Sequence, residues 1–329
     1  MKQYLNLAKK AMDTGIRKKN RTGVDHIGYT GDMMKFDLSK GFPAVTTKKL
    51  AIKSVIAEML GFLRGYRYAS DFRALGCMVW DANANENEQW LANPNRKMVD
   101  DLGGVYGVQA RAWESIRYAS CQKELDALLA RGYTLVGEPT KFDNYYDEKY
   151  CIVENDTGNR VISAYCENII DQLKMVVDDL SKGIDNRREI VTHWNPGQMD
   201  NMALPPCHMF YQFGIQGDRL NLSMYQRSCD VPLGIPFNIA GYAWLLSVIA
   251  QITGLKAGEF THFMHDIHIY ENQMELMREQ VTREPKQLPK LLINPEIRTL
   301  EDLETWVTPD NFSLVDYEHH PHIKYPFAV

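Results

Sequence analysis

The sequence is poor in cysteine and lacks cysteine pairs with metal-site or redox-motif spacing. Six cysteines are scattered along 329 residues, none of them in a CxxC pair: Cys77, Cys121, Cys151, Cys166, Cys207 and Cys229. Zinc sites need closely spaced ligand pairs, and small secreted scaffolds need a high cysteine density. We therefore expect a reduced, cytoplasmic protein with no metal and no disulfides.

Uninterrupted apolar runs are also absent. The longest apolar stretch, Ile239 to Leu255, is broken by glycine and polar residues and is shorter than the ~20 residues of a membrane helix. The first ten residues lack the apolar segment of an export signal and have the pattern of an amphipathic helix. We expect the 239–255 segment to be a buried helix, with no membrane partner.

A large excess of positive charge is missing as well. The formal net charge is -5 and the isoelectric point is near 6.0. An acidic surface does not attract nucleic-acid phosphates or anionic lipids, so neither is a required partner. The glycine-containing segment 103–107 does not have the spacing of a phosphate-binding loop or a dinucleotide fingerprint.

Helical and alternating patterns are interleaved along the chain. Apolar residues recur at helical spacing in Gln3–Lys18, Ile52–Leu63 and Ile239–Leu255. Alternating residues predict hairpins at His26–Phe36 and Met209–Tyr225, and further strands at Phe260–Met264 and Ile267–Tyr270. The predicted fold class is α+β, with a large mixed, mostly antiparallel sheet and packed helices. We expect one domain over 1–329, with residues 114–166 as an insertion.

One stretch combines a thiol, an imidazole and a guanidinium. Cys207-His208 follows two prolines, which restrict the backbone, and Arg227 lies one hairpin later. The thiolate is the reactive form of cysteine, and a nearby cation favours it. The alternative is that Cys207 is a small core side chain.

Other candidates also have structural alternatives when taken alone. Glu58 lies at the edge of an apolar helix stripe, where it is either a surface residue or a partly buried functional carboxylate. Arg21, beside a Thr-Gly turn, is either an anion ligand or a solvated helix end. The adjacent Arg187 and Arg188 are typical of a solvated strand end.

Taken in order, the motifs resemble the thymidylate synthase family over most of the chain. The matching segments are Asn20-Arg21-Thr22-Gly23, Gly41-Phe42-Pro43, Thr46-Thr47-Lys48, Glu58, Trp80-Asp81, Val105-Tyr106-Gly107, Asn186-Arg187-Arg188, Cys207-His208, Tyr225 to Asp230, Leu233 to Ile239, Asp266 to Tyr270, Arg283 to Leu291 and Ala328-Val329. The resemblance implies one-carbon transfer from methylenetetrahydrofolate to C5 of dUMP.

The resemblance implies that Cys207 adds to uracil C6 and turns C5 into a nucleophile. Negative charge then develops on O4. The resemblance implies that Glu58, acting through water, His208 and Asn238 stabilise this charge. Asn238 matches uracil O4 and N3-H, although a flipped amide would suit cytosine. The resemblance adds to the catalytic set Tyr106, Arg227 and Asp230.

The same resemblance assigns the binding residues. Substrate ligands are Arg21, Arg227 and Ser228 for the phosphate, with Arg187 and Arg188 reaching across a homodimer interface, and His268 and Tyr270 for the deoxyribose 3′-hydroxyl. Folate contacts are Trp80, Asp230, Gly234, Phe237 and Ala328. A fixed cationic set suits a monophosphate dianion. The implied partners are therefore dUMP, the reduced folate and a second copy of the chain.

Several positions depart from the family pattern, and they cluster where the folate and the transferred carbon would lie: Ala51, Gly61, Asn83, Pro232 and Met264-His265. A polar residue in an aromatic wall would admit water, which converts the methylene intermediate to a hydroxymethyl group instead of a methyl group. The retained Trp80, Tyr106 and Ala328-Val329 favour methylation to dTMP, which we predict. Two alternatives stay open, a dUMP hydroxymethylase and a non-catalytic nucleotide- or RNA-binding protein.

Overall fold

The computed structural model describes residues 1–19, 23–119, 122–135, 151–154 and 160–327. It divides into two compact units, one made of Met1–Arg111 and Gln172–Val329 and the other of Ala112–Asp171. The predicted insertion, 114–166, lies within the second unit. Its status as an insertion in a single domain stays a prediction.

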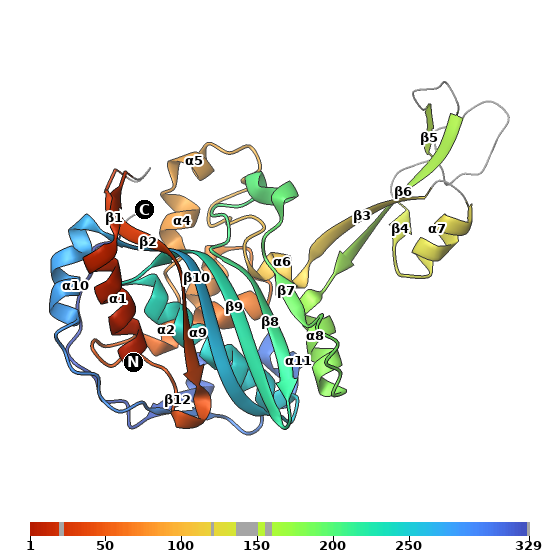
Figure 1. Ribbon diagram of the computed structural model, residues 1–329. Helices are drawn as coiled ribbons and strands as arrows, with labels where there is room; N and C mark the ends of the chain where they lie inside the picture. Colours follow the sequence, from red (N-terminus) through yellow and green to blue (C-terminus); the bar gives the residue numbers. More distant parts are fainter. Residues whose placement is uncertain (20–22, 120–121, 136–150, 155–159, 328–329) are drawn as a thin grey trace. The chain divides into compact units, whose positions relative to one another are not determined.

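A six-stranded sheet organises the larger unit (Figure 1). Its strands, in spatial order, are β1 (Ile16–Lys18), β2 (His26–Asp37), β10 (Lys256–Tyr270), β9 (Arg219–Asp230), β8 (His208–Gln216) and β7 (Ile190–Thr192). The β9–β10 pair is parallel and the other described pairs in this sheet are antiparallel. The α+β fold class with a mixed, mostly antiparallel sheet is confirmed.

Helices pack on this sheet and around it. They are α1 (Lys2–Thr14), α2 (Ile52–Leu63), α3 (Ala69–Ala74), α4 (Asp81–Asn85), α5 (Glu88–Leu91), α6 (Gly107–Arg111), α8 (Gln172–Ser181), α9 (Gly234–Ile252), α10 (Met274–Gln280) and α11 (Leu300–Glu304). A small second sheet pairs β11 (Lys290–Ile293) with β12 (Phe312–Val315).

The long apolar helix α9 connects β9 to β10 and fills the core. By length and composition alone it would qualify as a membrane span, but 72% of the qualifying window is buried inside the protein. It meets α2 closely at Gly241, where a Cβ atom would lie 3.1 Å from the sulfur of Met59. The predicted buried helix is confirmed, because its apolar surface is covered by α2 and the sheet.

The smaller unit has its own short sheet and helix. Its elements are β3 (Trp113–Ala119), α7 (Gln122–Leu129), β4 (Thr134–Leu135), β5 (Cys151–Glu154) and β6 (Arg160–Ile170). The strands β3, β4 and β5 all pair antiparallel with β6. A small apolar cluster of Ala119, Leu128, Tyr133 and Cys166 holds the described part together.

Two local predictions were wrong. The predicted hairpin at 26–36 is one continuous strand, β2, since it pairs along its length with the fifteen-residue strand β10. The first helix ends at Thr14, four residues before the predicted Lys18. Gly15 is extended there, and the next three residues form the edge strand β1.

A bulge interrupts the β8–β9 pairing at its start. His208 pairs with Gln226 whereas Phe210 pairs with Tyr225, so Met209 is an extra residue in β8. The carbonyl of Met209 accepts hydrogen bonds from the backbone of His193, at 2.8 Å, and of Trp194, at 3.2 Å. Bulges redirect side chains, and this one lies two residues after Cys207.

Candidate active site

Cys207 lies immediately before β8 and is half-buried. Its backbone N–H donates to the hydroxyl of Tyr106 at 2.7 Å, and its carbonyl accepts from the N–H of Arg227 at 2.9 Å. The thiol is therefore attached to a backbone fixed from two sides, by β9 and by the start of α6.

The Arg227 guanidinium is held against the two prolines before Cys207. Its Nε donates to the carbonyl of Pro206 at 2.9 Å and its Nη2 to the carbonyl of Pro205 at 2.7 Å. The guanidinium also lies 5.4 Å from the ring centre of Trp194. These contacts place a fixed positive charge beside the cysteine-bearing segment, as the sequence predicted for thiolate chemistry.

Glu58, on α2, is a partly buried carboxyl rather than a surface group. Desolvation raises the pKa of Glu58 to about 7, although a hydrogen bond from Trp80 Nε1 at 3.1 Å opposes this shift. The Trp80 ring in turn packs on Tyr106, with ring centres 5.7 Å apart. Glu58 is thus connected to the Cys207 backbone through two aromatic residues, and it can both accept and release a proton near neutral pH.

Two buried histidines flank Tyr106. Burial lowers the pKa of His208 to about 4 and that of His193 to about 3, so both are neutral near pH 7. Their ring centres lie 5.2 Å and 5.3 Å from that of Tyr106. Burial also raises the pKa of Tyr106 well above its ordinary value, which keeps its hydroxyl protonated. The centre of the site is therefore made of neutral hydrogen-bonding groups.

The amide orientation of Asn238 is fixed by a buried chain of hydrogen bonds. Gln226 Nε2 donates to the backbone carbonyl of Ser228 at 2.8 Å and to Asn238 Oδ1 at 2.9 Å. Because a carbonyl can only accept, the atom of Gln226 that faces it must be the nitrogen. His262 Nε2 then donates to Gln226 Oε1 at 2.8 Å, and Asn238 is left with Nδ2 as its donor.

The remaining polar side chains of the site lie at neighbouring positions on β9 and β10. Ser228 pairs with Asp266, and Asp230 pairs with His268, one step further along. The ring centres of His268 and Tyr270 are 5.2 Å apart, and His268 Nδ1 lies 3.1 Å from Asp266 Oδ1. Burial raises the pKa of Asp230, opposed mainly by His268. This part of the site combines a half-buried carboxyl with hydroxyl and imidazole groups.

Known proteins match this chain over its whole length. A family model described as Thymidylate synthase matches residues 2–329. Relatives named Thymidylate synthase include those of Shewanella halifaxensis, at 45% identity, and Haemophilus influenzae, at 46% identity. Both alignments cover 100% of this chain and 100% of the relative. This chain belongs to the thymidylate synthase family.

The other residues predicted from the family resemblance lie on two further segments. Arg187 and Arg188 are exposed on the turn before β7. Phe237 and Gly234 lie in the first turn of α9, where a Cβ on Gly234 would contact Asp230 and Asn238 at 3.5 Å and 3.6 Å. Two predicted residues, Arg21 and Ala328, lie outside the described residues.

Site neighbours that the sequence reasoning missed are Gln226, His193, Trp194 and His262. The sequence did contain a signal for Gln226. It lies two residues before Ser228 and four before Asp230 on one strand, and side chains at this spacing lie on the same face. Lys48 was predicted only as part of a family motif, with no role of its own. Burial lowers the pKa of its ammonium group to about 8, and the group donates to the carbonyl of Pro232 at 2.6 Å.

The departures from the thymidylate synthase family pattern have distinct settings. Gly61 faces the ring of Phe72, and Asn83 is half-buried in α4. Met264 is buried whereas His265 is exposed. Pro232 is buried beside Lys48, and Ala51 is the exposed N-cap of α2. Only Asn83 among these adds a polar side chain at a half-buried position.

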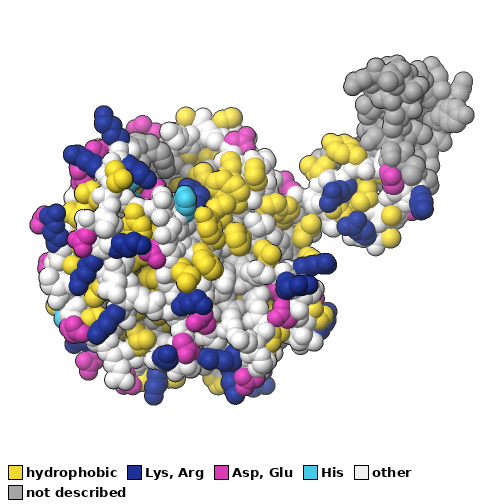
Figure 2. All heavy atoms as spheres, in the orientation of Figure 1, with side chains coloured by type: hydrophobic (Ala, Val, Ile, Leu, Met, Phe, Trp, Pro, Cys, Tyr) yellow, Lys and Arg dark blue, Asp and Glu magenta, His cyan; other side chains and the backbone are white. Residues whose placement is uncertain are grey.

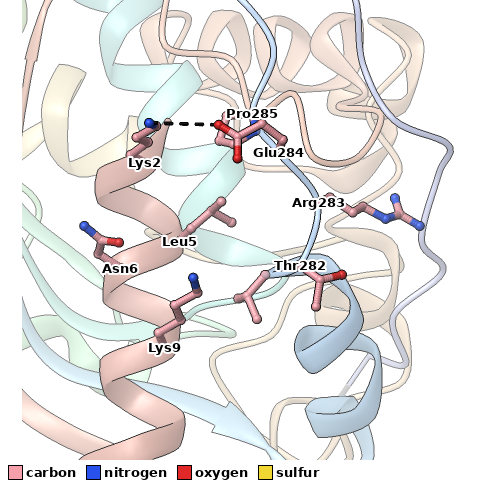
Figure 3. Close-up of a pocket in the computed structure, with 9 residues that line it drawn as sticks. Lys2, Leu5, Asn6, Lys9, Thr282, Arg283, Glu284 and Pro285 are labelled. Carbon is pink, nitrogen blue, oxygen red and sulfur yellow. Dashed lines mark ion pairs between the residues drawn. The ribbon is translucent and has the colours of Figure 1, made fainter.

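A surface groove of about 380 Å³ lies elsewhere, between α1 and residues 281–285 (Figure 3). Its charges partly neutralise one another, since Lys2 lies 3.9 Å from Glu284. Its lining includes none of the residues described around Cys207. In the described part of the chain, no group of three or more His, Cys, Asp or Glu residues is placed to hold a metal ion.

Proposed function

We propose that this protein is a thymidylate synthase that converts dUMP to dTMP with methylenetetrahydrofolate as one-carbon donor and reductant. The observation that carries the proposal is the attachment of the Cys207 backbone to Tyr106 and Arg227, with Glu58 two aromatic rings away. The arrangement supplies a fixed nucleophile, a fixed cation and a proton-transfer group with a pKa near neutrality.

Cys207 adds to C6 of the pyrimidine, and the electron pair of the C5–C6 double bond moves toward O4. The developing enolate requires hydrogen-bond donors, which Asn238 Nδ2 and the neutral His208 supply. Glu58 relays protons to and from the ring through water. Tyr106 keeps Cys207 in place during these steps by accepting its N–H.

The hydrogen-bond chain through Gln226 supports uracil as the base. With its oxygen committed to Gln226, Asn238 presents Nδ2 as a donor, which suits the uracil O4 acceptor and not the cytosine amino group. The ribose 3′-hydroxyl is assigned to His268 and Tyr270. Arg227, Ser228 and Arg21 bind the phosphate.

The proposed homodimer would form through the open face of the large sheet. A row of side chains crosses four strands there, since Met33 pairs with Phe263, Phe263 with Tyr225, and Tyr225 with Phe210. Three of these four apolar or aromatic side chains are 38% to 50% exposed. Figure 2 shows hydrophobic side chains gathered on this side of the larger unit. Contiguous apolar surface of this kind is typical of a protein interface.

In this dimer, Arg187 and Arg188 of each subunit contribute to the other subunit's phosphate site. Their turn lies at the edge of the same sheet, before β7, and both side chains project into solvent. Catalysis would then depend on dimerisation. We also propose that the enzyme acts in the cytoplasm, as expected from its scattered cysteines.

Folate would lie beside Trp80, Asp230, Gly234 and Phe237, with Ala328 closing over it. An aromatic group of Phe62, Phe72, Trp80 and Tyr106 packs behind this position, with ring centres 4.7 Å to 6.0 Å apart. A dry aromatic wall favours hydride transfer over hydration of the methylene intermediate, and so favours methylation.

The deciding experiment combines trapping with product analysis. Incubation with 5-fluoro-dUMP and methylenetetrahydrofolate should give a covalent adduct on Cys207, detectable by intact mass. With dUMP, the products should be dTMP and dihydrofolate. Tetrahydrofolate with a hydroxymethyl nucleotide would instead indicate the hydroxymethylase, and no adduct at saturating ligand would refute both enzymatic functions.

A further inference from the structure

A buried carboxylate directly follows the two exposed arginines before β7. Glu189 is only 1% exposed, and in the described part of the chain no cation pairs with it. Carboxylates are almost never fully buried without compensation, because desolvating the charge is costly. The compensation at this position must therefore come from other hydrogen-bond donors.

Those donors are backbone N–H groups of the arginine turn itself. Glu189 Oε1 accepts from the N–H of Asn186 at 3.1 Å, and Oε2 accepts from the N–H of Arg188 at 3.0 Å. The two oxygens of one carboxylate thus bind the residues on either side of Arg187. Charge-assisted hydrogen bonds of this kind are about twice as strong as neutral ones.

The turn needs such support because its backbone is strained. Arg187 has a φ of 69°, in the left-handed region that costs a non-glycine residue about 1–2 kcal/mol. The Arg187 carbonyl is held in addition by Gln212 Nε2, at 3.1 Å. Strain of this size persists only where the surroundings fix it, and it clusters at functional positions.

Two further bonds tie this segment to β8. The N–H of Ile215 donates to Asp185 Oδ2 at 2.9 Å, and the N–H of Phe213 donates to the Glu189 carbonyl at 2.9 Å. The segment from 185 to 189 is therefore fixed at both ends and in the middle. A simple connection between α8 and β7 would not require this degree of support.

The result is a rigid backbone that presents two outward cations. Among the described residues, neither Arg187 nor Arg188 has a side-chain ion pair or hydrogen bond. We propose that Glu189 is a positioning residue, whose buried carboxylate fixes the turn so that the arginines of one subunit reach the nucleotide phosphate bound by the other. This inference rests on the proposed function and adds to it a residue that acts through the arginines.

A first test measures the kinetics of Glu189→Gln. This change keeps the size of the side chain but removes its charge and replaces one accepting oxygen with an NH2 group, so that one of the two carboxylate bonds to the turn is lost. We expect KM for dUMP to rise about tenfold while kcat stays within about twofold. Losing one hydrogen bond between Glu189 and the turn loosens the two arginines, and this weakens phosphate binding by about a factor of ten. The matched control is Glu296→Gln at an exposed carboxylate, which should leave both constants unchanged.

The second test asks in which subunit Glu189 acts. Differently tagged Glu189→Gln and Cys207→Ser chains are co-expressed and the heterodimer is purified. Its one site with an intact Cys207 receives arginines from the Cys207→Ser subunit, whose Glu189 is intact. We expect this heterodimer to recover the wild-type KM for dUMP. A KM that stays raised would show that Glu189 supports only its own subunit, and would overturn the inference.

A third variant covers the case in which Glu189→Gln folds poorly. Gln212→Ala removes the brace on the Arg187 carbonyl without disturbing a buried carboxylate, and should raise KM for dUMP in the same direction. A normal KM in both variants would also refute the inference. Failure of the proposed function would look different, because the wild-type protein itself would then form no dTMP.

Discussion

A Cβ atom on Gly61 would lie 2.3 Å from the ring of Phe72, so these two positions compete for one space. The resemblance to the thymidylate synthase family predicts tryptophan at position 61, on α2, where this chain has glycine. In this chain the aromatic ring comes instead from Phe72, on α3, and packs against Phe62 and Trp80 with ring centres 5.8 Å and 6.0 Å away. The space beside Gly61 is therefore filled by a ring from a neighbouring helix.

Replacing Phe72 with alanine should loosen Trp80 and let water into the folate side of the site. We expect a destabilisation of about 3–5 kcal/mol from the cavity, and a rise in the share of hydroxymethyl product and tetrahydrofolate. Urea unfolding and product chromatography measure the two effects. The control is Phe312→Ala beside Trp244, which should destabilise the protein and leave the products unchanged. Identical product ratios in both variants would contradict the role given to Phe72.

Cys207→Ser should abolish dTMP formation and the 5-fluoro-dUMP adduct, because a serine hydroxyl is too weakly acidic to add to C6. Binding of dUMP should remain measurable by calorimetry, since the phosphate and ribose ligands are unchanged. Cys229→Ser, at a buried thiol on β9, is the comparison and should keep the adduct. Turnover that survived in Cys207→Ser would refute the assigned nucleophile.

The raised pKa of Glu58 predicts that the stability of the protein depends on pH. Its pKa is about 7 in the folded protein against an ordinary value of 4.5, so folding favours the protonated form. The stabilisation from this group is fully present below pH 4.5 and is lost as the pH rises through 7. Glu58→Gln should therefore be more stable than wild type at pH 8, by about 3 kcal/mol, and nearly equal to it at pH 4.

Urea unfolding of the two proteins at pH 4 and pH 8 measures this difference. Turnover of Glu58→Gln should fall by about a hundredfold or more, because proton relay is lost. A stability difference that did not change with pH would show that the Glu58 pKa is near its ordinary value.

Gln226→Glu should weaken the preference for uracil. The new carboxylate has no N–H to donate to Asn238 Oδ1, so the Asn238 amide is expected to turn and present its oxygen to the base. That arrangement suits the cytosine amino group. Affinity for dUMP should fall about tenfold relative to dCMP, as measured by competition binding. An unchanged ratio of the two affinities would mean that Gln226 does not set the Asn238 orientation.

The sequence predicted the fold class and the family because these depend on local patterns and long motifs. The apolar composition of α9 and the alternation in β8 and β9 were sufficient to place those elements. The hairpin predicted within β2 was wrong because the turn-like residues around Gly31 are overridden by pairing with β10. A strand partner more than two hundred residues away leaves no local signal.

Side-chain contacts also explain what the sequence left open at the site. The orientation of Asn238 depends on a carbonyl at Ser228 and on His262 from another strand. The burial of Glu58 depends on Trp80, and the support of the arginine turn depends on Gln212 of β8. None of these contacts could be read from helical or strand periodicity, because it does not show which side chains will meet.

The extra residue at Met209 has a consequence for insertions and deletions near the nucleophile. Side chains of a strand alternate between its two faces, so removing the bulge would move every residue before it to the opposite face. The β8–β9 pairing from Phe210 onward would be unaffected, and the core would still form. A one-residue deletion here would therefore turn the thiol away from its substrate while the strand pairing beyond Phe210 keeps its register.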